Sequence, residues 1–221
     1  VARISSRPSR WRAVVRPKGS TPVRSPSRTT TRRRPARRRI RSNSSIADLP
    51  YPISIEWPPR WLDAQQPVAD CRRNVFARYG LAADALLAVG VERWDYTKGI
   101  PERIAAVERL LEVEPQWQGR LVLLQVAAPS RSKLPAYVDI QCATQAATDR
   151  INARFGNGAY RPVILVTEYR NPDEVYELYR ASDLCVVNSL DDGMNLGAKE
   201  FVPSREDDDG VLVLSTFAGA S

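Results

Sequence analysis

The sequence predicts an α/β domain built on a Rossmann-like, doubly wound parallel sheet. Between residues 86 and 214, short apolar runs alternate with segments whose apolar residues recur at helical spacing. Each run is apolar throughout rather than at every second residue, which is typical of strands buried on both faces of a parallel sheet. The polar residues after each run then gather at the carboxyl edge of the sheet, where ligands bind in this fold class.

Local signals place the elements in order along the chain. The 71–79 helix stops at Gly80, and the helix after Gly99 has Pro101 in its first turn, with Ile104, Val107 and Leu111 on one face. The expected strands cover residues 51–56, 86–91, 121–126, 163–166, 184–187 and 211–214. The other expected helices lie within 134–155, 173–181 and 196–202.

The positive charge of the chain is concentrated in its first 41 residues. They contain 15 of the 33 Lys and Arg and no acidic residue, so the net charge of +8 leaves 18 basic and 25 acidic residues from residue 42 onward. Residues 1–46 are too poor in apolar side chains to offset the entropy of ordering, so we expect a disordered leader and then one incomplete globular domain over 47–221. The leader is interpreted as an electrostatic arm for nucleic acid or anionic lipid, as a solvated tail, or as sequence foreign to the folded gene product.

Several classes of protein are excluded by the composition. The chain has no His, and Cys71, Cys142 and Cys185 show no CxxC spacing, so the usual structural zinc patterns are excluded and no metal is expected. Three scattered cysteines fit a reducing cytoplasm. No run approaches the about 18 to 20 apolar residues of a membrane span, and the leader lacks the apolar core of a secretory signal. We therefore expect a cytoplasmic protein with no membrane partner.

Two cations follow the apolar run at residues 86–91. Arg93 and Lys98 stand between that strand and the next helix, where an anion can lie against a helix amino terminus. Arg offers a planar fork for phosphate oxygens and Lys a mobile point charge. The alternative interpretation is a pair of ordinary solvated surface cations.

The segment from Asp192 to Glu200 follows the 184–187 strand and leads into a helix. Gly193 fits a tight turn, and Asp192 or Asn195 can cap the helix. The free backbone N–H groups from Asn195 to Gly197 would then face a diphosphate, and Glu200 can accept hydrogen bonds from a ribose diol. The alternative is a plain capped helix after a turn. Two such segments on one sheet favour a nucleotide phosphate as the ligand.

Both segments resemble hallmark motifs of the trehalose-6-phosphate synthases. The stretch from Val91 to Arg103 is similar to one hallmark, and the run Asp192-Gly193-Met194-Asn195-Leu196 through Phe201 is similar to another. The stretches 124–131, 178–183 and 211–220 complete the series in the family's order. The resemblance covers about residues 49 to 221 and does not include the leader.

The resemblance implies the donor-binding half of a two-domain GT-B fold and a retaining transfer of glucose from UDP-glucose to glucose 6-phosphate, without a metal or other cofactor. It implies that Arg93 and Lys98 hold the diphosphate and stabilise the charge that develops as the glycosyl bond breaks. Arg131 matches the position that reaches the acceptor phosphate, and Arg170 lies near the place of the uracil ring. The transferred glucose is then contacted by Asp192, Gly193, Met194 and Asn195, and the phosphate and ribose by Leu196, Gly197, Ala198, Lys199 and Glu200.

Two features depart from the family pattern. Gly197 stands where the family usually has Val, which costs about 1 kcal/mol of helix propensity and removes apolar cover near the nucleotide. The family's amino-terminal domain and final helices have no counterpart in the sequence, and residues 1–46 cannot replace them. We therefore expect a fragment that binds UDP or UDP-glucose weakly and transfers little on its own.

Three other functions stay open at this point. Glucosylglycerol-phosphate synthase shares the donor motifs and differs in its acceptor. A non-catalytic chain that binds nucleic acid through the leader has little support, because Trp11 is the leader's one aromatic residue and base stacking needs more. A non-catalytic subunit that pairs with a complete synthase is the third, and the oligomeric state is open, a homo-oligomer included.

Overall fold

The computed structural model describes residues 2–3, 53–130, 135–207 and 209–220. Apart from Ile53, these residues lie in one compact unit made of Val1–Val15 and Ser54–Ser221. The second unit, Arg16–Ile53, is otherwise outside the described residues. The predicted disorder of residues 4–46 and the predicted domain boundary at residue 47 therefore stay predictions.

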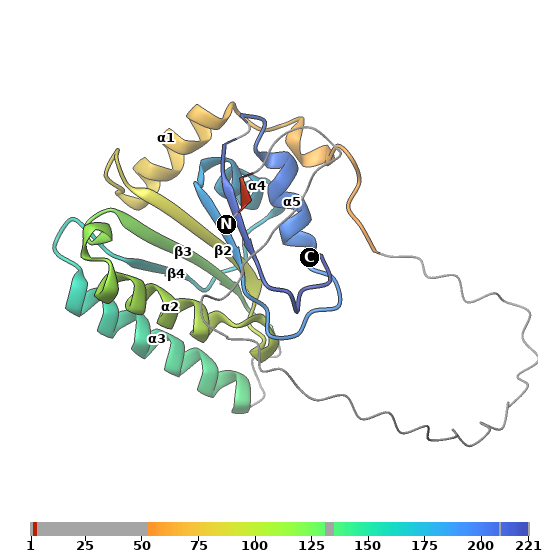
Figure 1. Cartoon of the computed structure of the whole chain (residues 1–221). Helices are drawn as coiled ribbons and strands as arrows, with labels where there is room; N and C mark the ends of the chain where they lie inside the picture. The colour runs from red at the N-terminus through yellow and green to blue at the C-terminus, as the bar shows by residue number, and fades with distance from the viewer. Residues whose placement is uncertain (1, 4–52, 131–134, 208, 221) are drawn as a thin grey trace, which may run out of the picture. The chain divides into compact units, whose positions relative to one another are not determined.

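Five parallel strands form the sheet that the sequence predicts, and Figure 1 shows them at the centre of the domain. In space the order is β6-β5-β2-β3-β4, with the two-residue β1 antiparallel to β6 at the edge. The chain starts in the middle at β2, moves outward to β4, and returns to the other side of β2 at β5. This is the doubly wound topology, and its switch point lies between β2 and β5. The strands are β1 (Ala2–Arg3), β2 (Leu86–Arg93), β3 (Leu121–Ala128), β4 (Val163–Val166), β5 (Leu184–Val187) and β6 (Val211–Leu214).

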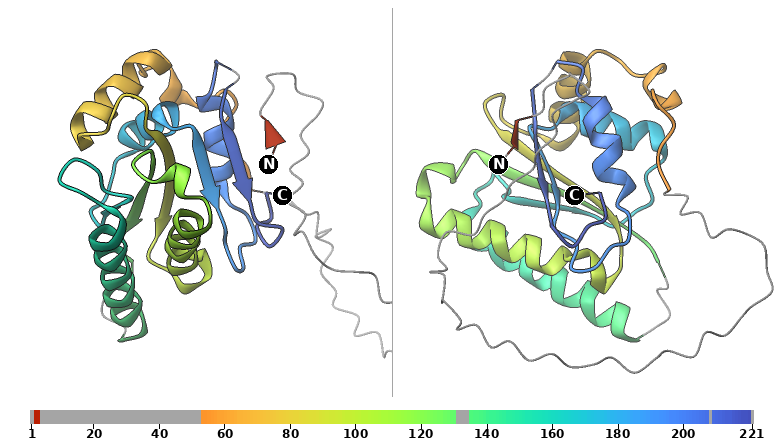
Figure 2. Two further views of the ribbon diagram at one scale, coloured as in Figure 1. Left: turned by 60° about the vertical axis from the view of Figure 1, so that its left-hand side comes forward. Right: turned by 45° about the vertical axis from the view of Figure 1, so that its right-hand side comes forward.

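Helices cover both faces of the sheet (Figures 1 and 2). One apolar cluster joins the sheet to α1, α4 and α5, and a second cluster joins it to α2 and α3. The helices are α1 (Val68–Tyr79), α2 (Ile100–Val113), α3 (Pro135–Phe155), α4 (Pro172–Ala181) and α5 (Leu196–Ser204), with short 3-10 turns η1 (Arg60–Leu62), η2 (Tyr96–Lys98) and η3 (Pro115–Trp117).

The apolar runs of the sequence follow from this two-sided cover. In β2, Leu87 and Val89 pack into the cluster under α1, α4 and α5, whereas Ala88 between them packs into the cluster under α2 and α3. Successive side chains of a strand point to opposite faces, so both faces need apolar residues. The predicted fold class, an α/β domain with a doubly wound parallel sheet, is confirmed.

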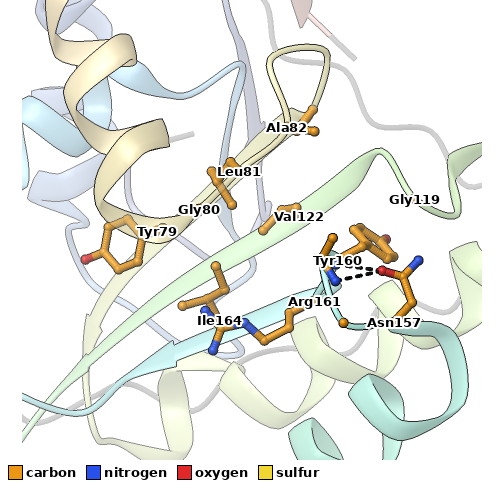
Figure 3. Close-up of a pocket in the computed structure, with 13 residues that line it drawn as sticks. Tyr79, Gly80, Leu81, Ala82, Gly119, Val122, Asn157, Tyr160, Arg161 and Ile164 are labelled. Atoms are coloured by element: carbon orange, nitrogen blue, oxygen red, sulfur yellow. Dashed lines mark hydrogen bonds between the residues drawn. The ribbon is translucent and has the colours of Figure 1, made fainter.

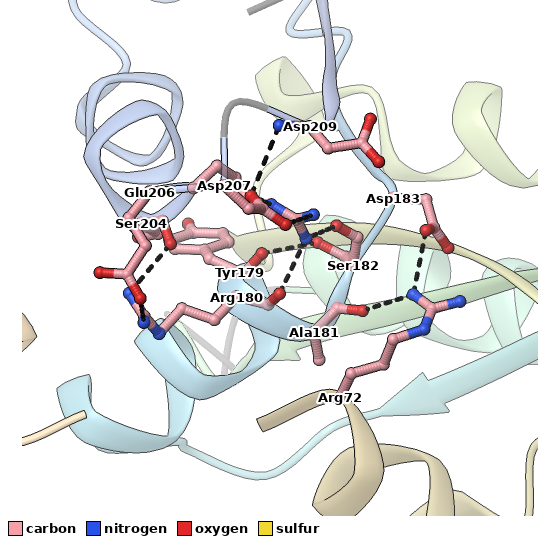
Figure 4. Close-up of polar contacts among 11 residues, drawn as sticks. Arg72, Tyr179, Arg180, Ala181, Ser182, Asp183, Ser204, Glu206, Asp207 and Asp209 are labelled. Atoms are coloured by element: carbon pink, nitrogen blue, oxygen red, sulfur yellow. Dashed lines mark hydrogen bonds and ion pairs between the residues drawn. The ribbon is translucent and has the colours of Figure 1, made fainter. Parts of the chain in front are cut away.

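Two arginines bind carbonyl groups at the carboxyl end of α4, and a third, within α4, pairs with a residue after α5 (Figure 4). Arg72 donates to the carbonyl of Ala181 at 3.0 Å, and Arg205 donates to the carbonyls of Arg180 and Ser182. Arg180 itself is buried and pairs with Glu206. The last carbonyls of a helix have no partner within the helix and carry the negative end of its dipole, so cations are the fitting partners. These contacts fix the turn from which β5 enters the sheet.

Some predicted boundaries were wrong. Residues 53–56 form neither strand nor helix, and residues 51–52 lie outside the described residues, so the predicted 51–56 strand is not present over its described part. No strand in the described ranges pairs with residues 53–56, and Pro58 and Pro59 follow them closely. Ala2–Arg3 form a strand although disorder was predicted there, because the edge of β6 offers unpaired backbone groups. The strand β2 continues to Arg93 because Glu92 and Arg93 pair with Ala127 and Ala128 of β3.

Candidate functional site

The switch point brings the two predicted phosphate-binding segments together. The backbone N–H of Leu190, after β5, donates to the carbonyl of Thr97, after β2, at 2.7 Å. The side chains meet as well, because Lys98 Nζ lies 2.6 Å from Asp192 Oδ2. The loops after β2 and β5 therefore form one connected site at the carboxyl edge of the sheet, where a doubly wound fold binds its ligand.

The first of these loops is a tight 3-10 turn held by its own side chains. Asp95 caps η2 by accepting from the backbone N–H of Thr97 at 3.0 Å and from its hydroxyl at 2.9 Å. Burial tends to raise the pKa of Asp95, but these bonds outweigh it and its pKa lies below the usual value. Gly99 ends the turn with φ 66°, and a Cβ there would lie 2.6 Å from the carbonyl oxygen of Asn188. Glycine is therefore required where the two loops touch.

The second loop presents the amino terminus of α5. Asn195 caps this helix, since its Oδ1 accepts from the backbone N–H of Ala198 at 2.8 Å. The predictions named Asp192 or Asn195 for the cap, and the structure selects Asn195 because Asp192 is engaged by Lys98. In the part of the chain that the structure describes, the backbone N–H groups of residues 195–197 donate no hydrogen bond. Helix-terminal N–H groups of this kind can bind an anion, and their predicted place against a diphosphate stays a prediction.

Gly193 does not have the role that the sequence suggested. A Cβ at Gly193 would meet open space, so the turn itself does not require glycine there. The close approach is instead at Gly219, where a Cβ would lie 1.9 Å from the carbonyl oxygen of Gly193. This contact arises because Asp192 bridges to Ala218, with Gly219 N donating to Asp192 O at 2.8 Å. The loop after β6 thus supports the loop after β5.

The charged side chains of the site differ in their exposure and in their ion pairs. Lys98 and Asp192 are largely buried against each other, with side chains 16% and 9% exposed. The side chain of Arg93, the last residue of β2, is exposed and makes no hydrogen bond or ion pair with another described residue. Glu200 lies one turn into α5, and burial raises the pKa of its carboxyl. Its neighbour Lys199 reaches the hydroxyl of Ser54 at 3.4 Å.

A buried polar network beneath the two loops had no predicted role. Arg103 of α2 donates to Asn188 at 2.7 Å and to Gln125 at 2.6 Å, and its guanidinium lies 3.8 Å from Glu92. Glu92 accepts in turn from Asn195 at 3.3 Å. Burial raises the pKa of Glu92, although Arg103 opposes the shift. Two signals could have found the network: a charged residue on the apolar face of a helix, and Gln125 within an apolar strand.

Of the other two predicted site residues, only Arg170 lies within the described ranges, and no contact joins it to these loops. Arg170 follows β4, two strands from the switch point, and its side chain pairs with Glu168 at 3.0 Å and Glu174 at 3.3 Å. Arg131 lies outside the described residues. Their predicted roles at the uracil ring and at the acceptor phosphate stay predictions.

A separate hollow of about 540 Å³ lies at the opposite, amino-terminal edge of the sheet (Figure 3). Its walls include Tyr79, Val122 and Tyr160, and the Tyr160 hydroxyl donates to the carbonyl of Leu121 at 2.7 Å. Because it lies at the other end of the strands, it is not part of the candidate site. Within the described ranges, no group of three or more Cys, Asp or Glu side chains is placed to hold a metal ion, and no helix is long and apolar enough to cross a membrane.

The fold is a doubly wound α/β domain of the kind found in GT-B proteins, and comparison with known proteins identifies its family. The model of glycosyltransferase family 20 matches residues 42–221, so the chain belongs to that family. Over 149 residues it is 44% identical to the UDP-forming alpha,alpha-trehalose-phosphate synthase of Pichia angusta, an alignment that covers 67% of this chain and 31% of that protein.

Solved structures agree with the sequence comparison. The E. coli trehalose-6-phosphate structure bound with UDP-2-fluoro glucose superposes with a TM-score of 0.69 at 36% identity, over 77% of this chain and 37% of that one. The Burkholderia xenovorans UDP-forming synthase in complex with glucose-6-phosphate gives a TM-score of 0.66 at 33% identity, over 77% and 37% of the two chains. The alignments thus cover 31% to 37% of the length of these three relatives.

Proposed function

We propose that this chain provides the donor-binding half of a retaining glycosyltransferase that moves glucose from UDP-glucose to glucose 6-phosphate. The observation that supports it most is the convergence of Lys98 and the amino terminus of α5 at the switch point, with Arg93 at the end of the strand that leads into the Lys98 loop. A diphosphate is the ligand that two cations and free backbone N–H groups fit together. The family and the ligands of the related structures favour UDP-glucose as the donor and glucose 6-phosphate as the acceptor.

In this proposal the charged groups act on the leaving group. As the bond between glucose and the diphosphate breaks, negative charge grows on the UDP oxygens. Arg93, Lys98 and the free N–H groups at the start of α5 stabilise that charge, and they need little rearrangement because loops and helix are already fixed. The transfer then needs no metal, and the residues assigned to the sugar are those from Asp192 to Asn195.

The acceptor and the cellular setting complete the proposal. Arg131 binds the phosphate of glucose 6-phosphate, and Arg170 contacts the uracil ring. We place the protein in a reducing cytoplasm, which the free cysteines Cys71, Cys142 and Cys185 support. No observation favours a nucleic-acid ligand or a particular oligomeric state.

Calorimetric titration of the 221-residue chain with UDP-glucose tests the proposal. We expect binding that weakens about 10- to 100-fold in Lys98→Ala and in Arg93→Ala, the effect of losing one hydrogen bond to a charged group. Arg109→Ala is the matched control, because Arg109 is an exposed cation of α2 paired only with Glu112 among the described residues. Absence of heat at millimolar UDP-glucose, in a chain shown to be folded, would contradict the proposal.

A further inference from the structure

Lys98, the cation best placed to hold a phosphate, is already paired with a carboxylate. Lys98 Nζ lies 2.6 Å from Asp192 Oδ2, and the two side chains are mostly shielded from water. The same carboxylate oxygen accepts from Asn195 at 3.0 Å and from the Ser189 hydroxyl at 3.3 Å. An ammonium has three N–H donors, so a phosphate can also approach Lys98, but it must then share the positive charge with a carboxylate that two further donors hold in place.

This competition is costly for a ligand that offers only phosphate. Burial tends to raise the pKa of Asp192, and the bonds from Lys98, Asn195 and Ser189 outweigh it, so the pKa lies below the usual value. If Lys98 turns to a phosphate, Asp192 loses its charged partner while it stays largely buried and faces a second anion. A buried carboxylate that loses its cation is strongly destabilised.

A ligand with hydroxyl groups next to the diphosphate removes this cost. A carboxylate accepts through two oxygens, and Asp192 Oδ1 takes no hydrogen bond from the described part of the chain. Sugar hydroxyls can therefore replace Lys98 as donors to Asp192 and release the ammonium for the diphosphate. Asn195, which also caps α5, keeps the carboxylate close to the helix amino terminus where both ligand parts must lie.

We propose that Asp192 is a specificity-determining residue that couples the two halves of the donor: it sequesters Lys98 from bare diphosphates and yields it when sugar hydroxyls bind the carboxylate. The inference rests on the proposed function for the identity of the donor. The exchange of hydrogen bonds favours a nucleoside diphosphate sugar over the free nucleoside diphosphate, and it returns Lys98 to Asp192 when the sugar has left.

The test compares inorganic pyrophosphate, UDP and UDP-glucose by calorimetry on the 221-residue chain and on Asp192→Asn. We expect Asp192→Asn to bind pyrophosphate and UDP about tenfold more tightly, and the preference for UDP-glucose over UDP to fall about tenfold, which corresponds to about 1.4 kcal/mol. Asp191→Asn is the matched control: it removes the same charge from the neighbouring position, and Asp191 is exposed and forms no ion pair with a described residue. It should change neither quantity by more than about twofold.

Lys98→Met separates the exchange from simple charge repulsion. In that background Asp192→Asn should no longer increase the affinity for pyrophosphate, because there is no ammonium to release. An increase of the same size with and without Lys98 would overturn the proposal, as would unchanged pyrophosphate affinity in Asp192→Asn alone. Should Asp192→Asn fail to fold by circular dichroism, Ser189→Ala weakens the hold on the same oxygen without changing charge. It should then give a smaller gain in the same direction, and the absence of any gain would count against the exchange.

The ligands also separate this proposal from the proposed function. Failure of the unmodified chain to take up UDP-glucose, together with a gain in pyrophosphate binding by Asp192→Asn, would refute the donor assignment and support the Lys98–Asp192 competition. If the chain binds UDP-glucose and Asp192→Asn leaves the ratio of the UDP-glucose and UDP affinities unchanged, the donor assignment is supported and the Lys98–Asp192 competition is refuted.

Discussion

Replacing Arg103 with Met is expected to be among the most damaging single changes in the domain. The guanidinium is 2% exposed and donates to Asn188 at 2.7 Å and to Gln125 at 2.6 Å. A hydrogen bond that involves a charged group contributes about 1.5–3 kcal/mol, and removal of one partner of a buried ion pair costs about 3–5 kcal/mol. Because Glu92 would be left buried without its cation at 3.8 Å, we expect the free energy of unfolding to fall by about 3–5 kcal/mol. That is a large share of the about 5–15 kcal/mol of a typical domain.

Urea unfolding followed by tryptophan fluorescence measures this change, since Trp94 is buried in the cluster under α2 and α3. The control is Arg109→Met on the same helix, whose side chain is 71% exposed and pairs at 3.0 Å with Glu112. It should cost less than about 0.5 kcal/mol. A loss below about 1 kcal/mol in Arg103→Met would refute the reasoning, because Asn188, Gln125 and Glu92 could not then depend on the guanidinium.

The double variant Glu92→Gln with Arg103→Met identifies the source of the cost. If the orphaned carboxylate dominates, the double variant is more stable than Arg103→Met alone, because a neutral amide replaces the unpaired charge. If the lost bonds to Asn188 and Gln125 dominate, the second substitution recovers nothing. Both outcomes are read from the same urea midpoints.

Three further changes test the loops and α5. Gly99→Ala should lower the free energy of unfolding by more than about 2 kcal/mol, measured by urea unfolding, because φ is 66° and the new Cβ would lie 2.6 Å from the carbonyl oxygen of Asn188. Gly197→Ala would place a Cβ 2.9 Å from the Tyr179 hydroxyl. Because Tyr179→Phe removes that hydroxyl, Gly197→Ala should stabilise the Tyr179→Phe variant by about 1 kcal/mol more than it stabilises the native chain. Equal effects on the two chains would contradict the contact. Burial raises the pKa of Glu200, so its negative charge opposes folding at a pH above the pKa of the unfolded chain. Glu200→Gln should therefore raise the melting temperature at pH 7, and this gain should vanish as the pH falls below 4.5. A gain that persists at low pH would exclude burial of the charge as its cause.

The sequence predicted the parts of the fold that depend on local apolar patterns. The strands at 163–166, 184–187 and 211–214 have the predicted bounds, because polar, proline or glycine residues flank each apolar run. The end of β2 was wrong by two residues because Glu92 and Arg93 are polar, and their place in the strand depends on pairing with β3, about 35 residues away. The sequence could not show that pairing.

The site was predictable in outline and not in its contacts. Lys98 and the Asp192 segment were found because polar residues after strands gather at one edge of a parallel sheet. That Lys98 pairs with Asp192, rather than standing free, depends on how the two loops fold against each other. The burial of Arg103 could have been predicted from the sequence, since Arg103 lies three residues after Ile100 on the apolar face of α2. A charge on that face requires partners, but the sequence does not show which residues these are.

The place of the buried network explains why the two loops can act as one site. At the switch point α2 packs on one face of the sheet and α5 on the other. The loops after β2 and β5 that lead into these helices are therefore joined to each other by side-chain hydrogen bonds. Arg103 reaches from α2 to Asn188 of the β5 loop, through the space beside Gly90, where a Cβ would lie 2.1 Å from its Nη1. From the other side Asn195 reaches Glu92 at the end of β2. Cross-links from both faces hold the Lys98 loop and the α5 terminus at a fixed spacing. The diphosphate of the proposed donor would therefore meet N–H groups that are already positioned, and its binding would require little reorganisation of either loop.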